Sequence, residues 1–380
     1  MTLGDGIRRN IASVDPMERG MLRDAFVELN NRAYPGGRND QRLGPDGNPR
    51  SVPGGVTWWF KQDEIHQATH VHDGPEFLPW HRVMVNRMEE LIRQINPQLS
   101  LHYWDWTQDP TRISGANFGG GSVGTLNLFD PNDGFMGYGG TTVAEIGEPW
   151  KSAGYYNPAA GVPDPDNPDA PVERDVPPPL VPNPFDPPRI VTRSVGGIVA
   201  SSQTRPTTAG EDRAIIMADD YRELRLRLEP VHNDRHEYVN MGGAHISFRD
   251  PFVFLLHSNV DRLFARWQTD PAHLLERLSP ETVYGPESDL DVVVHQVVQN
   301  LNNNVEPWST GHSFDQFGRE HLTRPWYGHE SGGEGETFTY KHPSVVSPPR
   351  YDTNAFTLNI DFGAYYLAAR AGSVDLLLLP

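Results

Sequence analysis

Apolar positions three and four residues apart predict a series of helices along this chain. The first begins at Asp15 and Pro16, a capping residue followed by a proline that suits a first helical turn. In a later segment an apolar stripe runs along one face until Pro97 ends it. The helical patterns lie at 15–34, 57–72, 77–97, 211–243 and 251–268. They predict a mainly α fold with a four-helix bundle as its core.

The remaining segments have other patterns. Residues 109–210 are rich in Gly, Pro, Asp and Asn, so we expect little regular structure in this long loop. Its large apolar residues are expected to dock on the helices: Trp150, Tyr155, Tyr156, Phe185 and Ile190. Alternating or β-rich runs occur at 291–298, 336–343, 355–362 and 373–380. We therefore expect a main domain over 1–275 and a small β-containing C-terminal extension over 276–380, packed on the core.

The net charge and the short apolar segments argue against two classes of partner, nucleic acid and membranes. The chain has 50 acidic and 32 basic residues, a formal net charge of -18, so it offers no bulk basic surface for nucleic acid. No segment approaches the roughly 18 consecutive apolar residues of a membrane span. The N-terminus carries no apolar signal-peptide region or small-residue cleavage site. We expect no membrane partner, and a cytoplasmic location or export together with a partner protein.

The absence of cysteine limits the chemistry of any bound metal. It excludes disulfides, zinc ribbons, iron–sulfur clusters and blue-copper sites. A metal must then be held by nitrogen or oxygen. The chain has 15 histidines, and their spacing decides whether they form sites.

One group of histidines lies in the second half of the chain. His232 and His236 are four apart, which puts both imidazoles on one face of a helix. Asn233 stands where a zincin motif would have glutamate. His257 follows in a highly apolar helical segment, where an unpartnered imidazole would be costly to bury. A metal-ligand role explains it, and a hydrogen bond to Asp261 is the alternative.

Asp261 itself has two interpretations. It could accept a hydrogen bond from a metal-bound His257, or it could form an ion pair with Arg262 or Arg266. We favour the ion pair.

A second group of histidines lies earlier in the chain and comprises His66, His70, His72 and His81. Three neutral imidazoles per ion suit copper and also zinc, and copper binds such ligands most tightly. Copper would permit redox chemistry. Zinc would supply a Lewis acid or an activated water, and a zinc hydrolase would normally need a carboxylate base nearby.

These motifs resemble those of the tyrosinase and catechol oxidase family of type-3 copper proteins. The resemblance is carried by FLPWHR, HNDRH and DPFVFLLHSNVDRLFARWQ, in this order, and covers residues 5 to 270. It implies that the domain over 1–275 binds two copper ions through two sets of histidines: His66, His72 and His81 for the first, and His232, His236 and His257 for the second. His70 is the alternative to His66, but it lies almost adjacent to His72.

The resemblance also implies the reaction and its partners. Such enzymes use dioxygen to oxidise o-diphenols to o-quinones, and some hydroxylate monophenols. The expected partners are a phenolic small molecule, dioxygen and a copper-delivery or caddie protein. Glu229 and Asn233 match positions that hold a water for deprotonating a monophenol. The alternative for Glu229 is a glutamate near a helix N-terminus, stabilised by the helix dipole.

The sequence departs from the family pattern at two points. Without cysteine the chain cannot form the thioether bridge of many relatives, and Leu256 stands where many have a histidine.

Three alternative functions remain. They are a dioxygen-binding haemocyanin-like protein, an o-aminophenol oxidase without monophenol hydroxylation, and a zinc or purely structural helical protein. Quinone formation from a catechol would separate an oxidase from an oxygen carrier.

Overall fold

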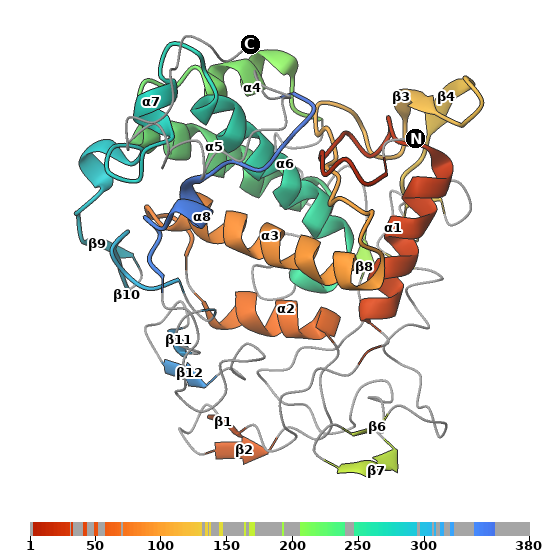
Figure 1. The fold of residues 1–380 in the computed structure, drawn as a ribbon, viewed down its shortest axis with the longest axis horizontal. Coiled ribbons are helices and arrows are strands. Elements are labelled where there is room, and N and C mark those ends of the chain that lie inside the picture. The colour runs from red at the N-terminus through yellow and green to blue at the C-terminus, as the bar shows by residue number, and fades with distance from the viewer. Residues whose placement is uncertain are drawn as a thin grey trace.

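The computed structural model describes residues 3–30, 58–69, 71–130, 206–239, 247–294, 297–305 and 338–353, with a few shorter pieces between them. The described chain is mainly helical (Figure 1). Its α-helices are α1 (Pro16–Leu29), α2 (Trp58–Ala68), α3 (Phe77–Ile95), α4 (Ala209–Ile216), α5 (Tyr221–Tyr238), α6 (Phe252–Gln268), α7 (Leu274–Arg277) and α8 (Pro343–Val346). Short 3-10 turns are η1 (Ser247–Arg249) and η2 (Gly285–Glu287).

The described strands form antiparallel pairs. They are β1 (Gln41–Leu43) with β2 (Pro49–Ser51), β3 (Ile113–Asn117) with β4 (Val123–Leu126), β5 (Ala144–Glu145) with β8 (Thr192–Arg193), β6 (Pro163–Asp164) with β7 (Asn167–Pro171), β9 (Val292–Val294) with β10 (Val297–Gln299), and β11 (His312–Phe314) with β12 (Glu320–Leu322). None of these pairs extends into a larger sheet among the described residues, so the core is formed by helices.

The long helices pack around one apolar core. Helix α3 packs against α1 and α6, and α6 packs in addition against α4 and α5. In Figure 1, α3 lies between α2 and α6. Helix α6 is buried along nearly its whole length, and its fully buried residues include Phe254, Leu255 and Leu263. The predicted mainly α fold with a helical core is therefore confirmed.

Local sequence signals explain where several helices begin. The Asp15 side chain accepts a hydrogen bond from the backbone N–H of Met17 at 2.9 Å, and Pro16 occupies the first turn of α1. The helical pattern over 211–243 proves to be two helices, α4 and α5. Asp220 starts the second of them by accepting from Glu223 N at 2.8 Å. The prediction of one continuous pattern missed this capping residue.

The aromatic segment over 101–107 lies largely in the interior. Trp104 and Trp106 are fully buried. The backbone N–H of Trp104 donates to Leu255 O in α6 at 3.0 Å, and the Trp106 indole donates to Asp212 at 2.7 Å. These bonds fix the segment against α6 and α4.

The predicted β regions are described only in part. The run over 291–298 folds back as the β9–β10 hairpin. In the run over 336–343, the described residues show only an isolated bridge between Asn304 and Thr339 before α8 begins. The runs over 355–362 and 373–380 and the five proposed apolar anchors of the long loop lie outside the described residues. The domain boundary near residue 275 stays a prediction.

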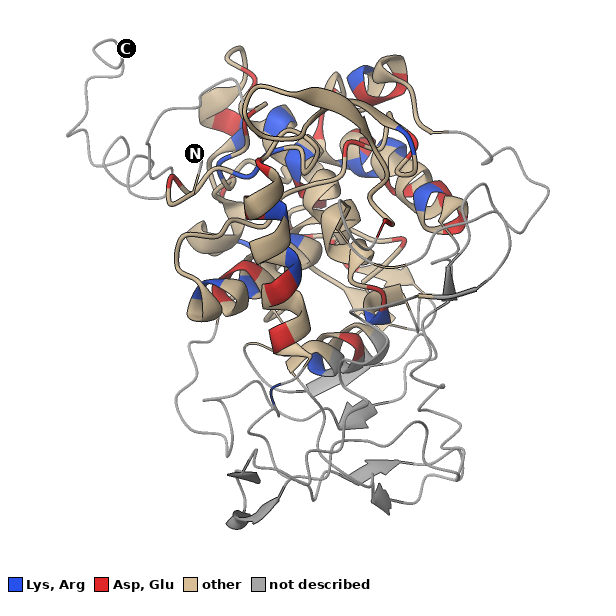
Figure 2. Cartoon of the chain, turned by 90° about the vertical axis from the view of Figure 1, so that its right-hand side faces the viewer, with Lys and Arg blue, Asp and Glu red and all other residues tan. Residues whose placement is uncertain are grey.

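Charged residues of both signs are interspersed along the helices (Figure 2). None of the described helices combines the length and apolar character that crossing a bilayer requires.

Candidate metal centre

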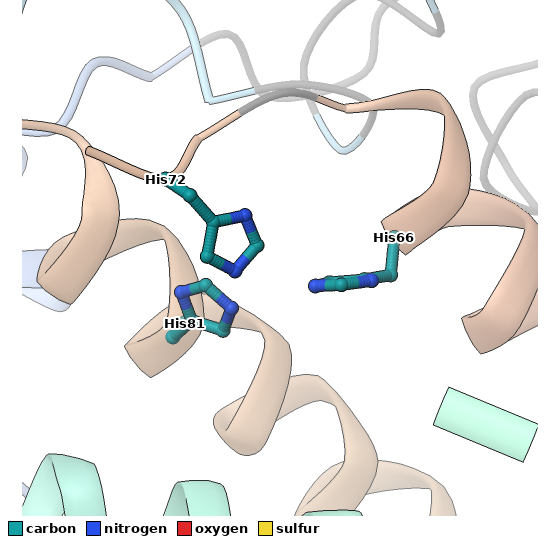
Figure 3. Close-up of side chains that lie close together, drawn as sticks. All are labelled: His66, His72 and His81. Atoms are coloured by element: carbon teal, nitrogen blue, oxygen red, sulfur yellow. The ribbon is translucent and has the colours of Figure 1, made fainter. Parts of the chain in front are cut away.

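The first group of histidines comes from two helices and the loop that joins them. His66 lies near the end of α2, His72 lies in the loop, and His81 lies near the start of α3. Figure 3 shows the three imidazoles turned toward one another. Their ring nitrogens lie within 4.8 Å of one another, a spacing that a single metal ion could bridge. His70 lies outside the described residues.

The second group lies on α5 and α6. His232 and His236 are one turn apart on α5, and His257 projects from the middle of α6. The Nε2 atom of His232 is 2.8 Å from Nε2 of His236 and 3.0 Å from Nε2 of His257. Three ring nitrogens thus converge on one point. We call the two groups the first triad (His66, His72, His81) and the second triad (His232, His236, His257).

The two triads face each other. The rings of His81 and His257 stack with centroids 4.7 Å apart and an angle of 11° between their planes. The rings of His72 and His232 also stack, with centroids 6.1 Å apart. Metal ions held by these triads would therefore be neighbours.

Backbone carbonyls fix the protonation of two imidazoles. The Nδ1 atom of His81 lies 2.8 Å from Phe77 O, and that of His257 lies 2.9 Å from Val253 O. A carbonyl oxygen only accepts, so Nδ1 must carry the hydrogen and Nε2 presents a lone pair. The Nε2 atom of His81 is buried and has no hydrogen-bond partner among the described residues. A buried nitrogen with a free lone pair is suited to bind a metal ion.

His232 is oriented in the same way. Its Nδ1 donates to Oδ1 of Asn233 at 2.9 Å, which leaves its Nε2 lone pair facing that of His257. Two lone pairs 3.0 Å apart repel each other unless a cation lies between them. Burial lowers the pKa of His81 to about 3 and the pKa values of His232 and His257 well below the usual range. These three imidazoles are therefore neutral, the form that binds metals.

The donor set restricts the identity of the metal. Each triad offers only imidazole nitrogen, without a carboxylate or thiolate. Such ligands suit copper and zinc and are poor ligands for magnesium or calcium. The residues present therefore fit copper.

Aromatic side chains surround the triads. The ring of Phe248 lies with its centroid 4.1 Å from that of His66 and 4.8 Å from that of His257. Phe77 lies 5.0 Å from His232. Phe248 belongs to the 3-10 turn η1, and sequence reasoning missed it because no periodic pattern marks such a turn. These buried rings make one side of the site apolar.

The two predicted polar residues lie beside the second triad. Glu229 is buried in the middle of α5, so its interpretation as a glutamate near a helix N-terminus is wrong. Its Oε1 accepts from the backbone N–H of Asp73 at 2.7 Å, and burial raises its pKa to about 8. Asn233 and Asp73 are exposed and His72 is half-buried, whereas the other five triad histidines are buried. The site therefore lies closest to solvent near Asn233 and Asp73.

Asp261 contributes to folding and not to the triads. Its oxygens accept from Arg82 Nε at 2.5 Å, from Tyr351 OH at 2.9 Å and from Arg8 Nη1 at 3.2 Å. The preferred interpretation as an ion-pairing residue is confirmed, but its partners are Arg82 and Arg8. The proposed partners Arg262 and Arg266 are not among them, since Arg262 pairs with Asp212.

Comparisons with known proteins give one family. The model of a domain described as the common central domain of tyrosinase matches residues 56–270. A tyrosinase of Streptomyces glaucescens is 26% identical over 244 residues, which cover 63% of this chain and 74% of the relative. A hemocyanin of Enteroctopus dofleini (A-type, units Ode to Odg) is 26% identical over 275 residues, 70% of this chain and 18% of the relative.

A solved structure is also similar. It is a mutant polyphenol oxidase from Thermothelomyces thermophila, with a TM-score of 0.51 and 18% sequence identity over 87% of both chains. At this identity, the likeness shows the fold alone.

Proposed function

The chain belongs to the tyrosinase family, and from this premise we propose that it oxidises o-diphenols to o-quinones with dioxygen. Membership makes it a type-3 copper protein with two copper ions as its cofactor, and its two triads fit such a pair. The observation that carries the proposal is the stacking of His81 on His257, because it puts the two triads face to face.

The proposed ligands are the six histidines of the triads. The first triad would hold one copper ion and the second triad the other. Support comes from the convergence of their ring nitrogens and from the backbone carbonyls that fix the tautomers of His81 and His257. When bound, the copper ions supply the redox chemistry that couples phenol oxidation to dioxygen reduction.

The protein's own part is to orient ligands and to keep water away. The Phe248 ring packs on His66 and His257, which makes that side of the site apolar. A phenol would enter from the more exposed side, near Asn233 and His72. There, Asn233 keeps Nε2 of His232 available by accepting from its Nδ1.

We assign the deprotonation of an incoming monophenol to Glu229, acting through a water held with Asn233. A buried carboxylate with a raised pKa is a stronger base than an exposed one, and a pKa near the operating pH suits a general base. Its hydrogen bond with Asp73 uses Oε1, so Oε2 would be available to accept from such a water.

Replacing Glu229 with glutamine tests this assignment. Glu229→Gln keeps the acceptor for Asp73 N and removes the basic carboxylate. We expect kcat/KM for a monophenol to fall about 100-fold or more, the usual contribution of a general base, with a much smaller fall for the matching catechol. Both rates are measured by oxygen uptake. The control is Glu237→Gln, an exposed glutamate on the same helix. Equal losses with both substrates would mean that Glu229 has only a structural role, through the hydrogen bond that it accepts from the backbone N–H of Asp73.

Dioxygen carriage is the second candidate, because the hemocyanin relative is as similar as the tyrosinase relative over a comparable share of this chain. An o-aminophenol oxidase without monophenol hydroxylation is the third. Catechol-driven oxygen uptake supports an oxidase, whereas reversible oxygen binding without quinone formation supports a carrier. Uptake with an o-aminophenol but not with a catechol supports the aminophenol oxidase.

A further inference from the structure

A residue far along the chain holds the loop that carries His72. Gln299, the last residue of β10, is fully buried. Its side-chain nitrogen donates to the backbone carbonyl of His72 at 2.8 Å, and its side-chain oxygen accepts from the backbone N–H of Glu76 at 3.2 Å. One amide group thus bridges the two ends of the turn over 72–76, which lies between α2 and α3.

The turn is shaped to receive this amide. A Cβ atom on Gly74 would overlap the Gln299 side chain, so only glycine allows the approach. Asp73 has a φ of 61°, in the left-handed region, which turns the chain sharply directly after His72. The backbone N–H of Asp73 donates to Glu229 on α5. Gln299 from one element and Glu229 from another therefore hold the same turn.

Neighbouring residues of Gln299 fasten the start of α3. The carboxylate of Glu76 accepts from the backbone N–H of Asn300 at 2.8 Å, from the Asn303 side chain at 3.1 Å and from Tyr340 OH at 3.1 Å. Glu76 directly precedes α3, the helix that carries His81. Residues 299–303 thus hold the main chain at His72 and the start of the helix that carries His81. In the part of the chain that the structure describes, no hydrogen bond joins these residues to a histidine of the second triad.

We propose that Gln299 is a positioning residue that sets the copper affinity of the first triad by fixing the main chain at His72. This inference rests on the proposed dicopper function. His72 is the ligand that needs such support, because it lies in a loop and is half-buried, whereas His66 and His81 lie on helices. Outer partners of metal ligands typically contribute roughly 10–100-fold in metal affinity.

The test measures copper affinity at each triad separately. His257→Ala leaves only the first triad complete, and His81→Ala leaves only the second. Gln299→Met, which keeps the side-chain volume and removes both hydrogen bonds, is introduced into each background. The copper dissociation constant is then measured by competition with a chelator of known affinity. We expect it to rise about 10–100-fold for the first triad and to stay unchanged for the second.

Two further variants make the result specific. Gly74→Ala should give the same selective loss, because its methyl group displaces the Gln299 amide. Asn302→Ala is the matched control: it removes an amide from the same segment, but one that contacts the exposed Asp289. It should leave both constants unchanged. The unfolding midpoint of each copper-free variant is measured in parallel.

The outcomes separate the inference from the proposed function. An unchanged first-triad constant in Gln299→Met would overturn the inference alone, and so would an equal loss at both triads together with a lowered unfolding midpoint. If neither single-triad background nor the unsubstituted chain binds copper, the proposed function fails and takes the inference with it.

Discussion

Replacing His257 with alanine is expected to lower the copper content from two ions per chain to one and to abolish oxygen uptake with phenols. His257 is fully buried on α6, its Nδ1 hydrogen is held by Val253 O, and its Nε2 lies 3.0 Å from that of His232. The alanine variant leaves only two imidazoles at the second triad. The affinity of this triad for copper should fall by more than the roughly 100-fold that follows from losing a residue that only hydrogen-bonds to a metal ligand.

The matched control for this variant is His70→Ala. His70 belongs to the earlier group of histidines, with His66, His72 and His81, but it is not among the proposed ligands. We expect His70→Ala to keep both copper ions and its oxidase activity. Copper is measured by elemental analysis after removal of loosely bound metal, and circular dichroism checks that both variants fold. Two copper ions bound to His257→Ala would contradict the ligand assignment. Loss of a copper ion from His70→Ala would mean that His70, and not His66, is the ligand of the first copper ion.

Replacing Asp261 with alanine is expected to cause the largest loss of stability, about 3–5 kcal/mol in the free energy of unfolding. Asp261, Arg8, Arg82 and Tyr351 are all buried. Arg8 also pairs with Glu89, so the buried network balances two guanidinium groups with two carboxylates. Without Asp261, a buried cation loses its partner, and water cannot reach it to compensate.

The control for the stability measurement is Asp24→Ala, which removes an exposed ion pair with Arg23 on α1. Such pairs contribute about 0–1 kcal/mol. Chemical unfolding of the copper-free proteins compares the two. Because Asp261 does not bond to His257, the folded Asp261→Ala protein should still bind two copper ions. A loss of stability no larger than that of Asp24→Ala would contradict the role given to the buried network.

The sequence predicted the features that depend on local spacing. Helix α6 was expected over 251–268 and occupies Phe252–Gln268. The pair His232 and His236 was expected on one helical face, and both residues converge with His257. These features follow from helical periodicity and from motifs within a few residues, which the sequence alone displays.

The features that the sequence did not predict depend on partners far apart in the chain. Gln299 is 227 residues from His72, and Arg8 is 253 residues from Asp261. Only tertiary packing brings these groups together, so no local pattern could have paired them. The start of α5 is different, because Asp220 and Glu223 have the spacing of a helix cap, which is a local signal that the sequence displays.

The most direct test of the account is the copper content of the unsubstituted, copper-loaded chain, combined with oxygen uptake on addition of a catechol and then of its monophenol. The account predicts two copper ions per chain and rapid catechol-driven uptake with quinone formation. Two ions without turnover would favour an oxygen carrier. A chain that binds no copper would contradict the central claim.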